Sequence, residues 1–337
     1  MPQGILENAR KNIEGKNLKI VLPEGSDARV LAAALRHKEE GLLTPIVLGD
    51  QGEIQKTANK EGLKLGDLQI INPQYSEHFD ELVEKFVEAR RGKTSKEEAE
   101  FLLKTNVNYF GVMLVKAGYA DGMVSGAVHT TGDTIRPALQ IIRTKPGVNR
   151  VSGVMVMIGP DGNQLVFADT AVNITLESDE LAEVAVETAK SAKSFGMDPY
   201  VALLSFSTHG SAHHDLATKV AKAKTRALEL DPDLKVEGEI QFDAAIDPTT
   251  AAQKAPGSDV AGKANVFIFP DLQAGNIGYK IAQRLGGYKA LGPILQGLNA
   301  PVNDLSRGCS AQDVYEIAII TAMQAAERKR EAEEANK

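Results

Sequence analysis

The chain has 337 residues, of which 43% are hydrophobic and 25% charged, as in folded globular proteins rather than disordered ones. Its 38 basic and 45 acidic residues leave a net charge of −7, which argues against non-specific nucleic-acid binding. The single cysteine, Cys309, excludes an intramolecular disulfide and Cys-based zinc sites. No apolar run is long enough to span a membrane, and residues 1–16 lack the apolar core of a signal peptide. We therefore expect a cytoplasmic protein.

Short apolar runs alternate with helical patterns along most of the chain. Strands are expected over residues 19–22, 45–48, 68–71, 122–125, 201–206 and 266–269, and a hairpin over 151–158 and 165–168. Helices are expected over 27–40, 75–91, 134–142, 181–195, 214–230 and 277–285, with further helices opening near 95 and 311. This alternation predicts an α/β fold with largely parallel sheets covered by helices.

Two hinge-like stretches suggest how the fold is divided. Residues 143–150 contain Pro146-Gly147, and residues 297–304 contain Pro301. The length alone suggests about two domains. We therefore predict two α/β/α domains, the first made of 1–145 plus 299–337 and the second of 146–298. In such folds ligands bind beyond the carboxyl ends of strands, so we expect an active-site cleft between the domains.

Nucleotide and metal motifs are weak. Residues 257–264 have the P-loop spacing, but Ala264 stands where Ser or Thr is needed, and the segment precedes a strand instead of following one. The adjacent His213 and His214 do not share a helix face, which favours surface or capping roles over metal binding. We expect no metal site.

The most informative segment is residues 303–313, a polar loop that runs into a helix. A helix N-terminus offers free N–H groups and the positive end of a dipole, and the Arg307 guanidinium matches phosphate oxygens. Ser310 and Asp313 also have the spacing of a capping box. From these residues alone we favour capping.

At this point the sequence resembles the phosphate acetyltransferase family over nearly the whole chain. The resemblance is carried by residues 121–126, 134–138, 254–265, 269–277 and 303–310. It implies reversible transfer of an acetyl group between acetyl phosphate and the thiol of CoA, with inorganic phosphate as the other product. It also implies a homodimer that uses CoA as a substrate and holds no tightly bound cofactor.

The resemblance implies roles for individual residues. Asp313 matches the base for the CoA thiol, and Arg307 and Ser306 match residues that hold acetyl phosphate and the developing charge. Binding of CoA or phosphate is implied for Arg90, Arg136, Arg29, Arg284, Lys254 and Ser125. The expected mechanism is direct attack by CoA in a ternary complex, and a covalent route through Cys309 is the alternative.

Three other functions stay open at this stage. One is the same reaction on a longer acyl phosphate such as butyryl phosphate, because one methylene changes binding by only about 1–3 kcal/mol. Another is an NAD-dependent hydroxy-acid dehydrogenase, which shares a related fold but requires nicotinamide and metal sites for which no motif appears. The third is a sensor that binds CoA or an acyl phosphate without turnover.

Overall fold

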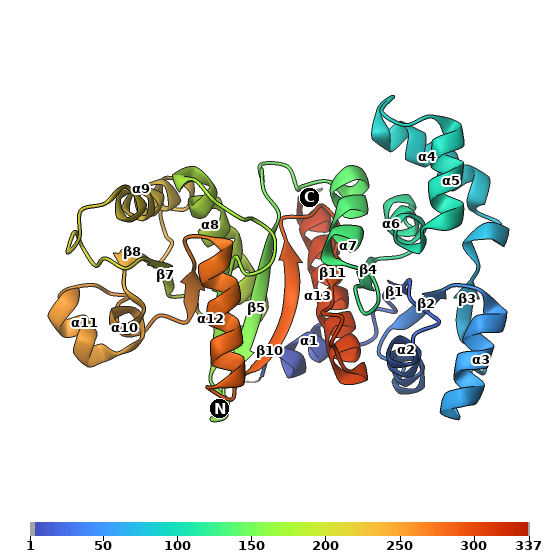
Figure 1. Ribbon diagram of the computed structural model, residues 1–337, viewed down its shortest axis with the longest axis horizontal. Coiled ribbons are helices and arrows are strands. Elements are labelled where there is room, and N and C mark those ends of the chain that lie inside the picture. The colour runs from blue at the N-terminus through green and yellow to red at the C-terminus, as the bar shows by residue number, and fades with distance from the viewer. Residues whose placement is uncertain (1–3, 336–337) are drawn as a thin grey trace. The chain divides into compact units, whose positions relative to one another are not determined.

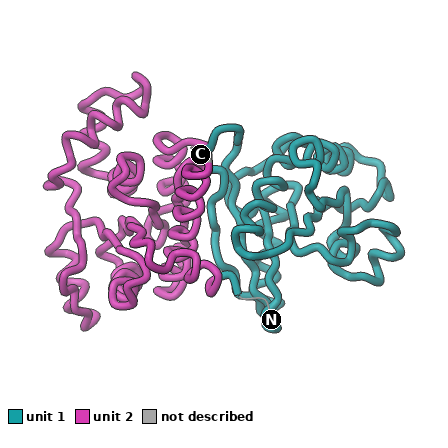
Figure 2. Tube along the Cα trace, turned by 180° about the vertical axis from the view of Figure 1, so that it is seen from behind, with its two compact units in different colours: residues 1–5, 145–297 teal, residues 6–144, 298–337 magenta. Residues whose placement is uncertain are grey.

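The computed structural model describes residues 4–335, which form a mixed α/β fold with largely parallel sheets (Figure 1). Two compact units divide the chain at 5/6, 144/145 and 297/298, and Figure 2 distinguishes them by colour. We call residues 6–144 with 298–335 the β1 unit, and residues 4–5 with 145–297 the β5 unit. Within the described residues, no helix is both long and apolar enough to cross a bilayer.

The β1 unit is built on a parallel sheet with the strand order β11-β4-β1-β2-β3. Its strands are β1 (Lys19–Leu22), β2 (Thr44–Leu48), β3 (Gln69–Ile71), β4 (Gly122–Ser125) and β11 (Val302–Asp304). The chain moves from β1 to β2 and β3 on one side, whereas β4 and β11 lie on the other side. The strand order therefore reverses between β1 and β4, the place where open α/β sheets bind ligands.

Helices of the β1 unit begin and end at residues suited to those positions. They are α1 (Ile5–Ile13), α2 (Ala28–Glu40), α3 (Gln51–Glu61), α4 (Phe79–Arg90), α5 (Lys96–Thr105), α6 (Val107–Ala117), α7 (Thr131–Pro137) and α13 (Ala311–Ala335). Asp27 caps α2 by accepting a hydrogen bond from the Arg29 amide. Helix α13 packs on α2 and β4 within this unit.

The β5 unit contains a mixed sheet with the order β10-β5-β6-β9-β7-β8. Its strands are β5 (Ser152–Ile158), β6 (Gln164–Ala168), β7 (Val201–Leu204), β8 (Val236–Ile240), β9 (Val266–Ile268) and β10 (Lys289–Gln296). Its helices are α8 (Ser178–Ser194), α9 (Asp215–Leu230), α10 (Phe242–Ile246), α11 (Pro248–Lys254) and α12 (Leu272–Arg284). Strands β5 and β6 pair antiparallel, which confirms the predicted hairpin.

The sequence-based boundaries differ from the structure in several places. The helix expected from residue 75 begins at Phe79, because Pro73 opens a separate 3-10 turn over Pro73–Tyr75. The helix expected over 134–142 begins earlier, at Thr131, and changes at Ala138 to a π-helical turn that ends at Ile142. Residues 302–304, expected within a hinge, pair with β4 as strand β11.

Candidate active site

Loops that follow β1, β4 and β11 meet at the carboxyl edge of the sheet in the β1 unit, beside the reversal of strand order. Because parallel strands end at the same edge, residues 23–27, 126–130 and 305–310 are brought together there. Hydrogen bonds join these loops to one another. Because ligands of open α/β sheets bind where the strand order reverses, we take this edge as the candidate site.

Ser306 and Arg307 are exposed on the loop after β11. The Ser306 hydroxyl accepts a hydrogen bond from the Gly308 amide at 3.3 Å, and its carbonyl accepts one from the Cys309 amide at 2.8 Å, which makes the loop a tight turn. Within residues 4–335, no ion pair or hydrogen bond of the Arg307 guanidinium is present. Arg307 is therefore available for an anionic ligand.

Asp313 lies in the first turn of α13 and forms the predicted capping box with Ser310. Its Oδ2 accepts hydrogen bonds from the Ser310 amide at 2.8 Å and from the Ser310 hydroxyl at 2.9 Å. The Asp313 amide donates in return to the Ser310 hydroxyl at 3.2 Å. The capping interpretation is confirmed by this geometry, which also fixes the carboxylate next to the Ser306–Arg307 turn.

Arg29 joins three segments of the site. Its Nε and Nη2 donate to the two carboxylate oxygens of Asp27 at 3.0 and 2.8 Å. Nη2 also donates to the Ala127 carbonyl at 2.8 Å, and Nη1 donates to the carbonyls of Arg307 and Cys309 at 2.8 and 2.9 Å. A guanidinium has five N–H donors, and all five are used here. Arg29 thus positions the loops that carry the exposed groups.

Arg90 and Arg136 lie close enough to one buried phenol to influence it. Arg90 ends α4, where its Nε donates to the Thr94 hydroxyl at 3.2 Å, and Arg136 is exposed on α7. Burial raises the pKa of Tyr109 above its ordinary value, and the charges of Arg136 and Arg90 oppose that rise. The charges of both arginines therefore act on the same residue of α6.

Ser125 ends β4 and is fully buried. Its hydroxyl donates to Asn108 Oδ1 at 2.7 Å, and Asn108 Nδ2 donates to the Asp133 carbonyl at 3.2 Å. The serine therefore connects the end of β4 through α6 to α7. This hydrogen bond gives it a supporting contact beneath the surface loop.

Two buried carboxylates at the same edge were not singled out from the sequence. Glu24 follows β1 and accepts hydrogen bonds from successive amides after β4, and Asp304 ends β11. Burial raises the pKa of Asp304 to about 6, even though the Thr131 hydroxyl donates to its Oδ2 at 2.7 Å. Its Oδ1 is buried without a hydrogen-bond partner. An acidic residue at the carboxyl end of a buried strand, or within two residues of that end, is the signal that could have identified both.

Gly126 explains how Asp304 can lie so close to the loop after β4. Its φ is +112°, a conformation that L side chains rarely adopt. A Cβ at this position would lie 2.3 Å from Asp304 Oδ1 and 2.7 Å from backbone atoms of Leu305. Glycine is therefore required for this close approach.

Arg284 and Lys254 belong to the β5 unit, where they end α12 and α11. Lys254 Nζ donates to Asp243 Oδ2 at 2.7 Å and to Gln241 Oε1 at 3.1 Å. Arg284 is exposed in the last turn of its helix. The predicted site residues are thus distributed over both units, and the contacts described above join Arg29 to the loop of Ser306 and Arg307 but do not link Arg90 or Arg136 to it.

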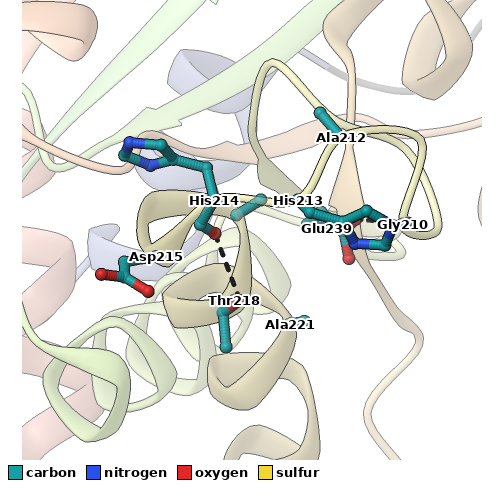
Figure 3. Close-up of a pocket in the computed structure, with 9 residues that line it drawn as sticks. Gly210, Ala212, His213, His214, Asp215, Thr218, Ala221 and Glu239 are labelled. Carbon is teal, nitrogen blue, oxygen red and sulfur yellow. Dashed lines mark hydrogen bonds between the residues drawn. The ribbon is translucent and has the colours of Figure 1, made fainter.

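A separate pocket of about 450 Å³ lies in the β5 unit, between the loop after β7 and the start of α9 (Figure 3). The buried Glu239 carboxylate accepts hydrogen bonds from the Ser207 hydroxyl at 2.9 Å and the Gly210 amide at 2.7 Å. His214 caps α9, with Nδ1 accepting from the Leu216 amide at 3.1 Å. That contact confirms the capping role expected for His214. None of the site residues predicted from the sequence lines this pocket.

Comparison with known proteins gives consistent matches over most of the chain. A family model described as Phosphate acetyl/butaryl transferase matches residues 3–322. Phosphate acetyltransferase from Staphylococcus aureus strain MRSA252 is 59% identical over 325 residues, which cover 95% of this chain and 98% of that protein.

Two solved structures agree with that result. The EutD phosphotransacetylase from Staphylococcus aureus is 59% identical, with a TM-score of 0.89, over 95% of this chain and 98% of that one. A phosphotransacetylase from Streptococcus pyogenes is 58% identical, with a TM-score of 0.92, over 96% of this chain and 98% of that one. Both sequence and fold therefore point to the same family.

Proposed function

Because the chain belongs to the phosphate acetyl/butaryl transferase family, we propose that Ser306, Arg307 and Asp313 carry a reversible acetyl transfer between acetyl phosphate and the thiol of CoA. The observation that carries this proposal is the unpaired Arg307 guanidinium, exposed on a tight turn beside the Asp313 carboxylate. An enzyme that transfers an acyl group from phosphate needs both a cation for the phosphate and an acceptor for the thiol proton.

At the acetyl carbon the reaction forms one bond and breaks one, and the thiol proton passes to Asp313. The CoA sulfur attacks the acetyl carbon, the new S–C bond forms, and the C–O bond to phosphate breaks. Arg307 binds the phosphate oxygens and stabilises the negative charge that grows on them, and the Ser306 hydroxyl adds a hydrogen bond. The phosphate leaves as an anion. In the reverse direction, phosphate attacks the thioester carbon and CoA leaves.

Asp313 is the proposed acceptor of the thiol proton. Both hydrogen bonds from Ser310 fall on Oδ2, which leaves Oδ1 to receive a proton. Ser310 thereby holds the carboxylate in one orientation at the start of α13. Proton transfer concerted with attack on the acetyl carbon fits this geometry.

The remaining assignments support binding of the larger substrate. Arg90 and Arg136 are proposed to contact CoA, with Arg29 and Ser125 acting on the loops between them. Arg284 and Lys254, and with them a cleft between two domains, stay predictions from the family resemblance. CoA is proposed to enter as a substrate and not as a bound cofactor, in a cytoplasmic enzyme.

A homodimer is also part of the proposal. Helix α12 exposes Ile277 and Ile281, 57% and 52% accessible, and the adjoining Leu285 is 85% accessible. Their spacing of four residues places them on one helical face. A second copy covering this face would remove it from water, so Ile281→Glu is expected to shift the molar mass measured by light scattering from dimer to monomer. An unchanged mass in this variant would contradict the assignment.

The transfer reaction is tested by the ultraviolet absorbance of the thioester. The purified protein receives CoA with acetyl phosphate, and in a second arm with butyryl phosphate, without nucleotide or NAD. Thioester formation with phosphate release supports the proposal, and the two arms rank the acyl chains. A protein that binds CoA but forms no thioester from either donor would be a sensor instead.

Two variants separate catalysis from folding. Arg307→Ala is expected to lower turnover by about 10²–10³-fold, because one charge-stabilising donor is lost. Asp313→Asn is expected to lose turnover while the melting temperature changes little, since an amide still caps the helix. An Asp313→Asn protein with normal turnover but a lower melting temperature would assign Asp313 to capping alone.

A further inference from the structure

A second basic region lies in the β1 unit and is not used by the proposed reaction. A pocket of about 490 Å³ is formed by α4, the end of α6, residues 141–144 and Asn299. Ser306, Arg307, Asp313, Arg90 and Arg136 do not line it. We call it the crossover pocket, because residues 144/145 and 297/298 are the places where the chain passes between the two units.

Positive charge dominates the crossover pocket. Lys85, Arg91, Lys116 and Arg143 line it, against a single carboxylate, Glu88. Such a concentration of cations is notable in a chain with a net charge of −7. Cations that outnumber the neighbouring carboxylates repel one another and attract an anion.

The cations of the crossover pocket differ in how they are held. Lys85 pairs with Glu81 at 2.6 Å. The Arg143 guanidinium donates through Nη2 to the carbonyl of Ala89, which keeps it at the wall. Among residues 4–335, the structure shows no side-chain hydrogen bond or ion pair for Arg91 or Lys116. Lys85 and Arg143 are therefore held by other groups, whereas the described residues provide no side-chain partner for Arg91 and Lys116, and all four line the crossover pocket.

Backbone geometry adds an independent observation. Arg91 has φ 52° and ψ 49°, and Arg143 has φ 65° and ψ −178°. Only four non-glycine residues of the described chain have positive φ, and these are two of them. The Arg143 conformation is one that glycine normally occupies, so this arginine lies at a strained backbone position in the pocket lining.

The floor and the rim of the crossover pocket define what it could hold. Ile141 and Ile142 are 1% and 4% exposed and give the pocket an apolar floor. At the rim, the Asn299 amide donates to the Arg143 carbonyl at 2.9 Å, and Thr144 forms an antiparallel bridge with Leu298. A ligand bound by Arg143 would thus lie next to both chain segments at this unit boundary, residues 143–144 and Asn299.

We propose that the crossover pocket binds a small phosphate-bearing organic molecule through Arg91, Lys116 and Arg143, at a site separate from Ser306 and Arg307. The planar guanidinium groups match phosphate oxygens in pairs, and the apolar floor accommodates the organic part. The volume is within the range of small-molecule sites. This inference concerns residues that the proposed reaction does not use, and it does not depend on the acetyl transfer.

The test is a calorimetric titration with inorganic pyrophosphate, which isolates the phosphate chemistry. It is done on Arg307→Ala protein, so that the proposed substrate site does not contribute. One saturable site per chain is expected, with affinity lowered about tenfold in Lys116→Ala, because one charge-assisted contact is lost. Arg91→Asn should act similarly, and asparagine tolerates the left-handed backbone at that position. Lys96→Ala, an exposed lysine on α5, is the matched control.

Three results would overturn the proposal. One is the absence of saturable binding. Another is binding that Lys116→Ala and Arg91→Asn leave unchanged while both proteins melt normally. The third is equal binding of citrate, which would show recognition of charge without preference for phosphate.

A kinetic measurement tests whether the crossover pocket is separate from the proposed substrate site. In otherwise unaltered enzyme, Lys116→Ala is expected to leave the KM for CoA within about twofold, whereas a KM that rises as pyrophosphate affinity falls would make the pocket an extension of the substrate site. If no transferase activity is found at all, the calorimetric result still decides whether the pocket binds phosphate. Failure of the two proposals can therefore be told apart.

Discussion

Nδ1 of His129 lies 2.8 Å from Oε1 of Glu24, at the edge of the sheet where the strand order reverses. The same carboxylate accepts the backbone amides of Gly126, Ala127, Val128 and His129 at 3.1, 2.8, 2.9 and 2.9 Å. A run of successive amides like this is an anion-binding concavity, and here the protein's own carboxylate fills it. Glu24 therefore fixes the loop to which Arg29 is also bound.

Glu24→Gln is expected to lower both stability and turnover. The amide would present N–H groups to backbone N–H donors, so several buried donors would lose their acceptor. The free energy of unfolding should fall by about 2–4 kcal/mol. Chemical denaturation and thioester formation measure the two effects. Glu53→Gln, on the exposed face of α3, is the control and should change neither.

The loss caused by Glu24→Gln should depend on pH. Burial disfavours the charged form of Glu24, but hydrogen bonds from His129 and the amides outweigh it and hold the pKa below its ordinary value. Its contribution to stability is therefore lost as pH falls through that lowered pKa. The hydrogen bond to Glu24 raises the pKa of His129, so the contribution of His129 is lost as pH rises through its raised value. The difference between the two proteins should be largest between pH 4.5 and 6.5. A difference that does not vary with pH would contradict the ion pair.

Arg29→Lys is expected to lower both turnover and thermal stability, although it keeps the positive charge. Lysine offers three donors from one point, whereas Arg29 uses five donors in a planar fork to join Asp27, Ala127 and the turn after Ser306. Turnover should drop more than tenfold, and the midpoint of thermal unfolding should fall. Arg226→Lys, in an exposed pair with Glu229 on α9, should change neither. Normal turnover in Arg29→Lys would mean that the fork is not needed to position the loops.

Local sequence patterns predicted the parts of the molecule that are determined locally. The apolar runs at 19–22 and 122–125 are β1 and β4 with the predicted bounds, and the Ser310–Asp313 capping box is present. The family resemblance is confirmed, as are the largely parallel α/β fold and the acyltransferase class that it implied. The bounds of β1 and β4 and the capping box depend on neighbouring residues, so local patterns are sufficient to predict them.

The contacts that build the site could not be found in this way. The amides that bind Glu24 lie 102 to 105 positions away in the sequence, and the partners of Arg29 lie up to 280 positions away. Strand β8 has the sequence Val-Glu-Gly-Glu-Ile, and β10 contains Gly292-Pro293, compositions that indicate loops locally. These residues become strands because neighbouring strands supply their hydrogen bonds.

Asp304→Asn is expected to remove a pH dependence of stability. Burial raises the pKa of Asp304 from 3.8 to about 6. A raised pKa means that the folded state holds the proton more tightly, so the contribution is fully present below pH 3.8 and is lost as pH rises through 6. The full difference is on the order of 3 kcal/mol. Relative to the unaltered protein, Asp304→Asn should therefore gain stability as pH rises from 3.8 to about 6, and the gain should stay constant at higher pH.

The control for this titration is Asp259→Asn, an exposed carboxylate in the β5 unit, whose stability should follow the unaltered protein at every pH. The hydroxyl of Thr131 donates to Asp304 Oδ2, and the charge of Glu24 also raises the Asp304 pKa. Thr131→Val removes that donor and should raise the pKa further. Equal pH profiles for Asp304→Asn and the unaltered protein would show that Asp304 does not titrate in this range.

Cys309→Ala is expected to retain turnover. The thiol is 7% exposed, and burial raises its pKa to about 11, although the nearby Arg29 charge opposes the rise. At neutral pH very little thiolate exists, and the thiolate is the nucleophile that a covalent acetyl-enzyme would need. The substitution should cost only about 1 kcal/mol of stability, because a small side chain leaves a small cavity. Initial rates of thioester formation are measured in Cys309→Ala, and alkylation by iodoacetamide, expected to be slow, is measured in the unaltered protein. A loss of turnover comparable to that of Arg307→Ala, in a protein that melts normally, would establish the covalent route, since packing alone gives Cys309 no part in the chemistry.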